Sequence, residues 1–196
     1  MRIRLAVPTD GPVLAEIYAP AVRDRTTSFE IDAPDGVEMA RRVSTLLART
    51  PWLVFEREGV VTGYAYASPH RDRAAYQWSV EVSAYVFPSA HRGGVGRRLY
   101  SALFEILALQ RFQNAYAGIT LPNVSSEAFH RSMGFTPVGV YHGVGFKFGA
   151  WHDVAWYERG LRPRENQPGT LAPPIPLSEL GDRETLEKIL GRSAGL

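Results

Sequence analysis

Residues 80–107 read VEVSAYVFPSAHRGGVGRRLYSALFEIL, and this stretch decides the fold. Its first part alternates as a half-buried strand does, with one apolar face: Val80, Val82, Ala84 and Val86. Pro88 ends the strand because it has no N–H to donate to a ladder. After a glycine-rich turn, apolar residues recur at helical spacing: Val95, Leu99, Leu103, Ile106 and Leu107. The stretch therefore predicts a strand, a turn and a helix.

The turn, RGGVGRR at residues 92–98, predicts a site for an anion. Glycines let the backbone approach a ligand, and the first N–H groups of the next helix are unpaired at the positive end of its dipole. A Walker A loop requires Lys and then Ser or Thr after its last glycine, whereas Arg97 follows Gly96. A dinucleotide fingerprint requires a third glycine where Leu99 stands. Both nucleotide motifs fail, and a plain strand-to-helix connection remains the alternative.

The segment 91–96 is similar to the pyrophosphate-binding loop of the GNAT acetyltransferases, whose pattern is (Gln/Arg)-x-x-Gly-x-(Gly/Ala). His91 departs from the first position of that pattern. Because the loop contacts its ligand mostly through backbone N–H groups, we expect the change to be tolerated. The resemblance implies an acetyl-CoA site made by Tyr85, Val86, His91, Arg92, Gly93, Gly94, Val95, Gly96, Arg97 and Asn123.

The rest of the chain supplies the other elements of a GNAT fold. Residue patterns predict strands at 2–7, 52–56, 60–67, 114–120, 136–139 and 154–158. Helices are predicted from about Asp10, with Pro20 weakening it, and at 34–49 and 123–133; a glycine-rich crossing joins the last two strands. The order is the GNAT order. It implies an α+β fold, an α/β three-layer sandwich whose mixed, mostly antiparallel central sheet is flanked by helices.

The composition changes at Pro163, where a proline-rich stretch begins. We expect a GNAT acetyltransferase domain over residues 1–162. Residues 163–196 are then a Pro-rich linker and a short C-terminal helical extension, with an amphipathic pattern over 177–190. That helix is expected either to pack on the domain or on a neighbouring subunit, or to fray.

Length and composition bound the class of protein. The 196 residues, 45% hydrophobic and 21% charged, are typical of one globular domain with a real core. The net charge of +2 is too small to indicate nucleic-acid binding, and the absence of cysteine excludes disulfides, thiolate metal sites and a cysteine nucleophile. No apolar run approaches the ~20 residues of a membrane span, and residues 1–8 lack a signal-peptide pattern. We expect a cytoplasmic protein that needs no metal and binds no membrane.

Several blocks narrow the resemblance to the phosphinothricin N-acetyltransferases. They cover nearly all of residues 2–162 in the right order: PWLV at 51–54, residues 63–68, AYQW at 75–78, Glu81, Tyr85-Val86, LPN at 121–123 and GAWHDV at 149–154. Relatives of that family act on methionine sulfoximine or methionine sulfone. The resemblance therefore implies acetyl transfer from acetyl-CoA to the primary amine of a small amino-acid-like acceptor.

Such a transfer requires a base, because a primary amine is mostly protonated at neutral pH. Glu81, on the polar face of the predicted central strand, is the candidate; a plain surface glutamate is the alternative. Backbone N–H groups around Val82–Val86 would meet the oxyanion. His130 stands where many GNAT enzymes carry a tyrosine that protonates the leaving thiolate, which implies a general acid or second base. A structural histidine is its alternative, as helix capping is for Asn123.

Recognition of the acceptor is assigned to Arg73, Tyr76 and Phe29, whose family equivalents line the acceptor pocket. A guanidinium binds a carboxylate in bidentate fashion, Tyr76 can add a hydrogen bond, and Phe29 an apolar wall. The block Trp151-His152-Asp153 is interpreted as structural, because adjacent residues of a strand point to opposite faces. Family resemblance also implies a homodimer, for which Trp151, Trp156 and Tyr157 are either exposed contacts or ordinary core.

Two other classes of function stay open. One is a GNAT enzyme that acts on another amine, such as a protein N-terminus or an aminoglycoside; these acceptors favour an acidic cleft, whereas Arg73 favours an anionic acceptor. The other is a non-catalytic acyl-CoA-binding module, which the presence of Glu81 disfavours.

Overall fold

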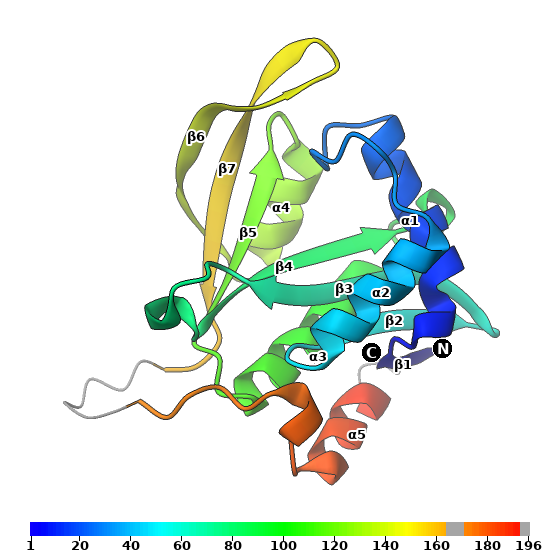
Figure 1. Ribbon diagram of the computed structural model, residues 1–196, viewed down its shortest axis with the longest axis vertical. Coiled ribbons are helices and arrows are strands. Elements are labelled where there is room, and N and C mark those ends of the chain that lie inside the picture. Colours follow the sequence, from blue (N-terminus) through cyan, green and yellow to red (C-terminus); the bar gives the residue numbers. More distant parts are fainter. Residues whose placement is uncertain (164–170, 193–196) are drawn as a thin grey trace.

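The computed structural model describes residues 1–163 and 171–192, and a seven-stranded sheet forms its centre (Figure 1). The strands lie in the order β1-β2-β3-β4-β5-β7-β6, and every neighbouring pair is antiparallel except β4 and β5. This arrangement confirms the α+β fold class and the mostly antiparallel sheet predicted from the sequence.

The elements follow the predicted order. The strands are β1 Arg2–Leu5, β2 Trp52–Arg57, β3 Val60–Pro69, β4 Ser79–Val86, β5 Asn114–Thr120, β6 Thr136–Lys147 and β7 Ala150–Gly160. The helices are α1 Gly11–Arg23, α2 Gly36–Leu47, α3 Val95–Leu109, α4 Val124–Ser132 and α5 Arg183–Arg192. Short 3-10 turns occupy Pro8–Asp10, Ala74–Tyr76, Pro88–Ala90 and Leu177–Glu179.

Two expectations need correction. Helix α1 runs through Pro20 to Arg23, because Ala21 and Val22 beyond the proline are buried and packing outweighs one missing hydrogen bond. The expected glycine-rich crossing between the last strands is instead part of a long β6–β7 hairpin. Its ladder shifts register between Tyr141 and Gly145, and a tight turn at Phe148 and Gly149, both with positive φ, closes it.

Helices cover both faces of the sheet, and alternation along the strands produces two cores. The α3 stripe predicted from the sequence is buried on one face, against Val80 and Val82 of β4. On the other face α1 and α2 bury Leu14 and Met39 against Trp52 and Tyr64. Each core removes large apolar side chains from water, which fixes the orientation of the strands between them.

The β4–β5 pair is the feature that positions the site. The two parallel strands pair only from Ser79↔Asn114 to Glu81↔Tyr116. Beyond Glu81 they separate, and β5 continues toward Thr120 while paired with β7 on its other edge (Figure 1). The sheet is therefore split between β4 and β5 over the second half of both strands.

The C-terminal extension packs on the domain. Leu177, Leu180, Leu186 and Ile189 are buried in the core on the α3 face, and Leu177 N donates to Arg49 O. The predicted helix begins only at Arg183, after Asp182 accepts a hydrogen bond from Thr185 N at 3.0 Å, and a 3-10 turn precedes it. Residues 164–170 of the predicted linker lie outside the described residues.

Asp10 fixes the turn that leads from β1 into α1. Its carboxylate accepts hydrogen bonds from Val7 N at 2.8 Å and from two Arg4 nitrogens at 2.8 and 2.9 Å. Burial opposes ionisation, yet Arg4 and the Val7 amide hold the pKa of Asp10 below its ordinary value of 3.8. The ionised carboxylate therefore stabilises the folded state.

We expect Asp10→Asn to lower the free energy of unfolding by about 2 kcal/mol at pH 7, since it removes charge-assisted hydrogen bonds. Because the folded-state pKa lies below the unfolded value, this contribution is present above pH 3.8 and is lost as pH falls through the folded pKa. Urea denaturation at pH 7 and at acid pH measures both effects. Asp32→Asn, at an exposed carboxylate, is the matched control; an equal loss in both variants would contradict the assignment.

Candidate active site

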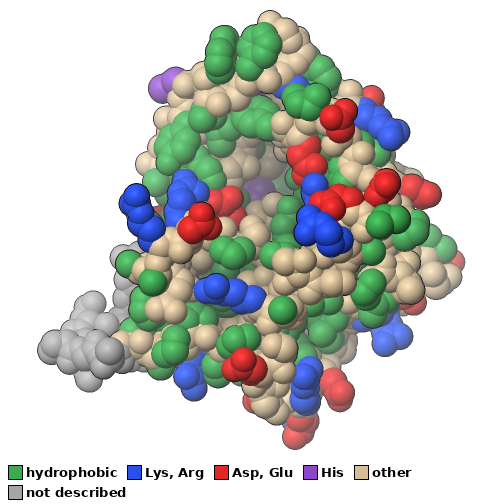
Figure 2. Space-filling view, viewed as in Figure 1, with side chains coloured by type: hydrophobic (Ala, Val, Ile, Leu, Met, Phe, Trp, Pro, Cys, Tyr) green, Lys and Arg blue, Asp and Glu red, His purple; other side chains and the backbone are tan. Residues whose placement is uncertain are grey.

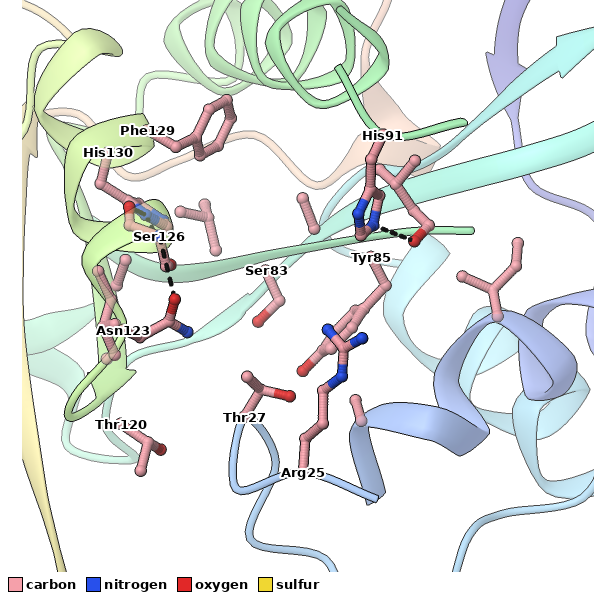
Figure 3. A pocket seen from close by; sticks show the side chains of 18 of the residues that line it. Arg25, Thr27, Ser83, Tyr85, His91, Thr120, Asn123, Ser126, Phe129 and His130 are labelled. Atoms are coloured by element: carbon pink, nitrogen blue, oxygen red, sulfur yellow. Dashed lines mark hydrogen bonds between the residues drawn. The ribbon is translucent and has the colours of Figure 1, made fainter. Parts of the chain in front are cut away.

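A cavity opens where β4 and β5 separate (Figure 3). Its lining includes Val82 and Ala84 from one face of β4 and Ser83 and Tyr85 from the other. Because neighbouring side chains of a strand point to opposite faces, the cavity passes through the sheet. The remaining walls come from the α1–α2 loop, the turn after β4, β5 and α4: Arg25, Thr27, His91, Thr120, Asn123, Ser126, Phe129 and His130.

The backbone of β4 forms one wall of this cavity. On its other edge β4 pairs with β3 from Val80↔Pro69 to Val86↔Gly63, and an antiparallel strand uses alternate residues for such pairing. The other residues direct their N–H and C=O groups to the side that β5 has left. The carbonyl of Val86 is 3.0 Å from His91 Nε2. The stretch 82–86, in which the sequence predicted oxyanion donors, thus borders the cavity.

The glycine-rich turn leads directly into α3. Arg92 and Gly94 have φ of +62° and +75°, and Gly94 precedes the first helical residue without a side-chain cap. The first turn of α3 contains Arg97 and holds no acidic residue. Gly96 lies against the Phe129 ring, which a Cβ at this position would approach to 3.4 Å. A helix N-terminus that lacks a side-chain cap and has a basic first turn fits the predicted anion site.

Helix α4 brings Asn123 and His130 to the cavity (Figure 3). Asn123 caps the helix as expected, since its Oδ1 accepts from Ser126 N at 3.1 Å. His130 lies further along the same helix and is buried. Both predicted residues therefore face one space together with Tyr85 and His91.

The hydrogen bonds of His130 define its protonation. Nδ1 lies 2.8 Å from the carbonyl oxygen of Ser126, which can only accept, so Nδ1 carries the proton. Nε2 lies 3.3 Å from the hydroxyl of Tyr100. Burial lowers the pKa of His130 below its ordinary value of 6.5, against the opposing effect of the Ser126 carbonyl. The ring is therefore neutral at pH 7 and accepts a hydrogen bond at Nε2.

Glu81 lies at the last paired position of β4 and β5, on the face opposite Val80 and Val82. Its Oε1 is 3.0 Å from His70 Nδ1 and 3.1 Å from an Arg71 nitrogen. Sequence reasoning found Glu81 but missed both partners. The contact follows from the register of the β3–β4 hairpin, in which Ser68 pairs with Glu81 and the chain just after β3 passes that carboxylate.

The three predicted acceptor residues do not gather in one cavity. Tyr76 lies near Glu81's partners, with its ring centroid 5.9 Å from that of His70. Arg73 is exposed and lines, with Tyr76, a second cavity beside Arg49. Phe29 lies on the α1–α2 loop, and its ring covers Gly145 of β6. A Cβ atom added to Gly145 would lie only 2.2 Å from that ring.

The α1–α2 loop is fixed to the β6–β7 hairpin. The buried Lys147 ammonium donates to the carbonyls of Val22 and Ser28, both at 2.7 Å, and burial lowers the pKa of Lys147. Figure 2 shows a hollow near the centre of this face, below the hairpin, with charged side chains of both signs along its rim.

The block Trp151-His152-Asp153 braces the hairpin. His152 Nε2 contacts Lys147 O at 2.9 Å, and Asp153 accepts from Gly143 N at 2.7 Å and faces His142 Nδ1 at 2.9 Å. Within residues 1–163 and 171–192, no group of three metal-ligating side chains lies together, and no helix has the length and apolar character needed to cross a membrane.

Known proteins resemble this chain over most of its length. The family described as Acetyltransferase (GNAT) domain matches residues 3–156. Phosphinothricin N-acetyltransferase of Streptomyces viridochromogenes is 36% identical over 87% of this chain and 95% of its own. The L-methionine sulfoximine/L-methionine sulfone acetyltransferase of Salmonella typhimurium is 37% identical over 82% and 95%.

A solved structure agrees with these relatives. The GNAT superfamily phosphinothricin acetyltransferase from Sinorhizobium meliloti, in complex with AcCoA, superposes with a TM-score of 0.77 at 37% identity. The match covers 84% of this chain and 93% of that one. With the split sheet and the glycine-rich turn at the start of α3, these matches lead to one assignment: the chain belongs to the GNAT family of N-acetyltransferases.

Proposed function

We propose that the protein transfers acetyl from acetyl-CoA to the primary amine of a small amino-acid-like acceptor of the phosphinothricin, methionine sulfoximine or methionine sulfone type. The observation that carries the proposal is the place of Glu81, a carboxylate at the last paired position of β4 and β5, directly before the residues of β4 that line the cavity. The relatives named as phosphinothricin and methionine sulfoximine/methionine sulfone acetyltransferases support the class of acceptor.

The glycine-rich turn and α3 fit the pyrophosphate of acetyl-CoA. The helix N-terminus lacks a side-chain cap, Arg97 lies in its first turn, and the backbone reverses at Arg92 and Gly94. The slender arm of the cofactor fits the cavity between the strands, along Tyr85 and Val86 and past Asn123. Acetyl-CoA supplies the acetyl group as a thioester.

The residues around the cavity then divide the chemistry. Glu81 takes a proton from the acceptor's ammonium, which makes the nitrogen nucleophilic. Backbone N–H groups of β4 within 82–86 stabilise the oxyanion, because they are fixed by the ladder to β3 and need no reorganisation. His130 fits a second base better than a general acid, since its ring is neutral and its one N–H is already bonded to Ser126.

We assign acceptor recognition to Arg73, Tyr76 and Phe29 on the family resemblance; of the three, Tyr76 lies beside His70, the partner of Glu81, and Arg73 shares a second cavity with Tyr76. Arg73 forms no salt bridge with any other residue in the described part of the chain, so its guanidinium is available for the acceptor's carboxylate. Arg71, by contrast, is already paired with Glu81.

We also propose that the chain forms a homodimer through the β6–β7 hairpin. This hairpin exposes large apolar side chains, including Val144, Phe146 and Trp151 at 51%, 56% and 68% exposure, and Figure 2 shows apolar side chains along its tip at the top of the view. Such a patch on one element is typical of an interaction surface. The family resemblance, which implies a homodimer, supports a second copy as the partner.

Glu81→Gln tests the base. We expect kcat to fall about 100-fold or more, because the isosteric amide cannot accept the ammonium proton. Release of free CoA thiol is measured with phosphinothricin, methionine sulfoximine, methionine sulfone, an N-terminal peptide and an aminoglycoside. Glu58→Gln, at an exposed hairpin turn, is the matched control. Full activity of Glu81→Gln would refute the base, and turnover of only the peptide or the aminoglycoside would change the acceptor class.

Arg73→Ala tests acceptor binding. We expect KM for the acceptor to rise about 10-fold or more with kcat little changed, since the lost contact binds the substrate's carboxylate and not the reacting atoms. Arg57→Ala removes a guanidinium from the β2–β3 turn and serves as the control. An unchanged acceptor KM would exclude Arg73 from recognition.

Trp151→Glu tests the dimer. We expect the wild-type chain to have twice the mass of one chain by light scattering and the variant to be monomeric, because a charge would be buried at the interface. Val37→Glu, at a similarly exposed site on α2, should leave the mass unchanged. A monomeric wild type would overturn this assembly.

A further inference from the structure

His70 is a half-buried imidazole that contacts three aromatic rings beside Glu81. Its side chain is only 14% exposed. The ring stacks on Tyr116 at a centroid distance of 4.5 Å and an angle of 18°, and meets Tyr76 and Trp156 edge-on at 5.9 and 6.1 Å. These contacts come from the β3–β4 loop, β5 and β7, so three segments fix the plane of the ring.

The ring is oriented so that it donates to the carboxylate. Its Nδ1 lies 3.0 Å from Glu81 Oε1, and an ionised carboxylate oxygen can only accept. Arg71 donates to the same oxygen at 3.1 Å. Both contacts are made to Oε1; among the described residues, none forms a hydrogen bond or salt bridge with Glu81 Oε2.

We propose that His70 is a positioning residue for Glu81: by holding Oε1 it directs Oε2 toward the acceptor's ammonium. This inference rests on the proposed function. An N–H bond of the ammonium breaks, its proton passes to Oε2, and the electron pair stays on nitrogen. That nitrogen then forms a bond to the thioester carbon, the sulfur departs with the electron pair of the C–S bond, and the second proton that the nitrogen loses passes to the departing thiolate.

His70 suits this task better than Arg71. The Arg71 side chain is 44% exposed, and a long guanidinium side chain has many rotamers to lose. His70 has two side-chain torsions, and its ring is stacked on Tyr116 and meets Tyr76 and Trp156 edge-on. Small displacements of a catalytic group reduce rates strongly, so the rigid partner sets the geometry.

Two substitutions separate the hydrogen bond of His70 from its packing. His70→Phe keeps an aromatic ring against Tyr116 and removes the donor. His70→Asn loses most of the ring but puts an amide nitrogen where Nδ1 stood. We expect kcat to fall about tenfold in His70→Phe, with KM for acetyl-CoA unchanged, and His70→Asn to recover most of it. The reverse order would overturn the proposal, because it would mean that His70 only fills space.

A matched pair elsewhere in the chain controls for nonspecific effects. His142 Nδ1 faces Asp153 Oδ2 at 2.9 Å on an exposed part of the hairpin, away from the cavity. His142→Phe removes the same kind of contact and should leave kcat unchanged. An equal loss in His142→Phe and His70→Phe would refute a specific role for His70.

The double variant His70→Phe/Glu81→Gln separates failure of this inference from failure of the proposed function. If Glu81→Gln is inactive and His70→Phe fully active, only the positioning role is wrong. If both single variants lose activity, we expect the double variant to fall no further than Glu81→Gln, since no base remains to be positioned. Independent losses that multiply would overturn the inference.

A spectroscopic readout does not depend on finding the acceptor. The ring ¹⁵N signals that vanish in His70→Phe belong to His70, and we expect them to shift in Glu81→Gln as the negative partner is lost. Unchanged signals would show that the two side chains do not interact in solution, even if no amine is acetylated and the proposed function fails.

Discussion

The structure depends on how few residues join β4 to β5. Parallel pairing stops after three positions, with Glu81↔Tyr116 as the last. The cavity and the free edge of β4 both result from this early end of the pairing. The separation frees one edge of the β4 backbone and opens a cavity through the sheet. It also leaves a carboxylate at the branch point, where it is partly shielded by the sheet but still reachable. A continuous sheet would have buried these backbone groups in a ladder.

The split is tolerated because each half of the sheet is stabilised separately. The β1–β4 half lies between two cores, one formed with α3 and one with α1 and α2. On the other side, β5 pairs with β7 along its whole length, from Asn114↔Gly160 to Thr120↔Val154. Helix α3 covers the place where β4 and β5 separate. Its buried face packs on both halves of the sheet, and its N-terminus lies at the end of β4. The same helix therefore closes the core and presents an N-terminus without a side-chain cap at the end of β4.

Much of this could be predicted from local sequence. The alternation from Val80 to Val86, the stripe from Val95 to Leu107 and the Asn123 cap are all present, because each depends on neighbours within a few residues. Contacts across the sheet could not be predicted in the same way. That His70 and Arg71 contact Glu81 was not predicted, because this contact is set by the register of the β3–β4 hairpin. The β6–β7 hairpin was missed for a similar reason: its glycines suggested irregular chain, but the ladder resumes at Gly145↔His152 after a register shift at which Asp153 accepts from Gly143 N.

The buried ammonium of Lys147 has a mechanical consequence. It joins the carbonyls at the end of α1 and in the loop after it to the last residue of β6, while Phe29 from that loop is lodged over Gly145. The α1–α2 loop and the β6–β7 hairpin are therefore held together, with the cavity on one side of these contacts and the apolar tip of the hairpin on the other. Because Arg25 and Thr27 of this loop line the cavity, the shape of that wall depends on the Lys147 and Phe29 contacts that hold the loop to the hairpin.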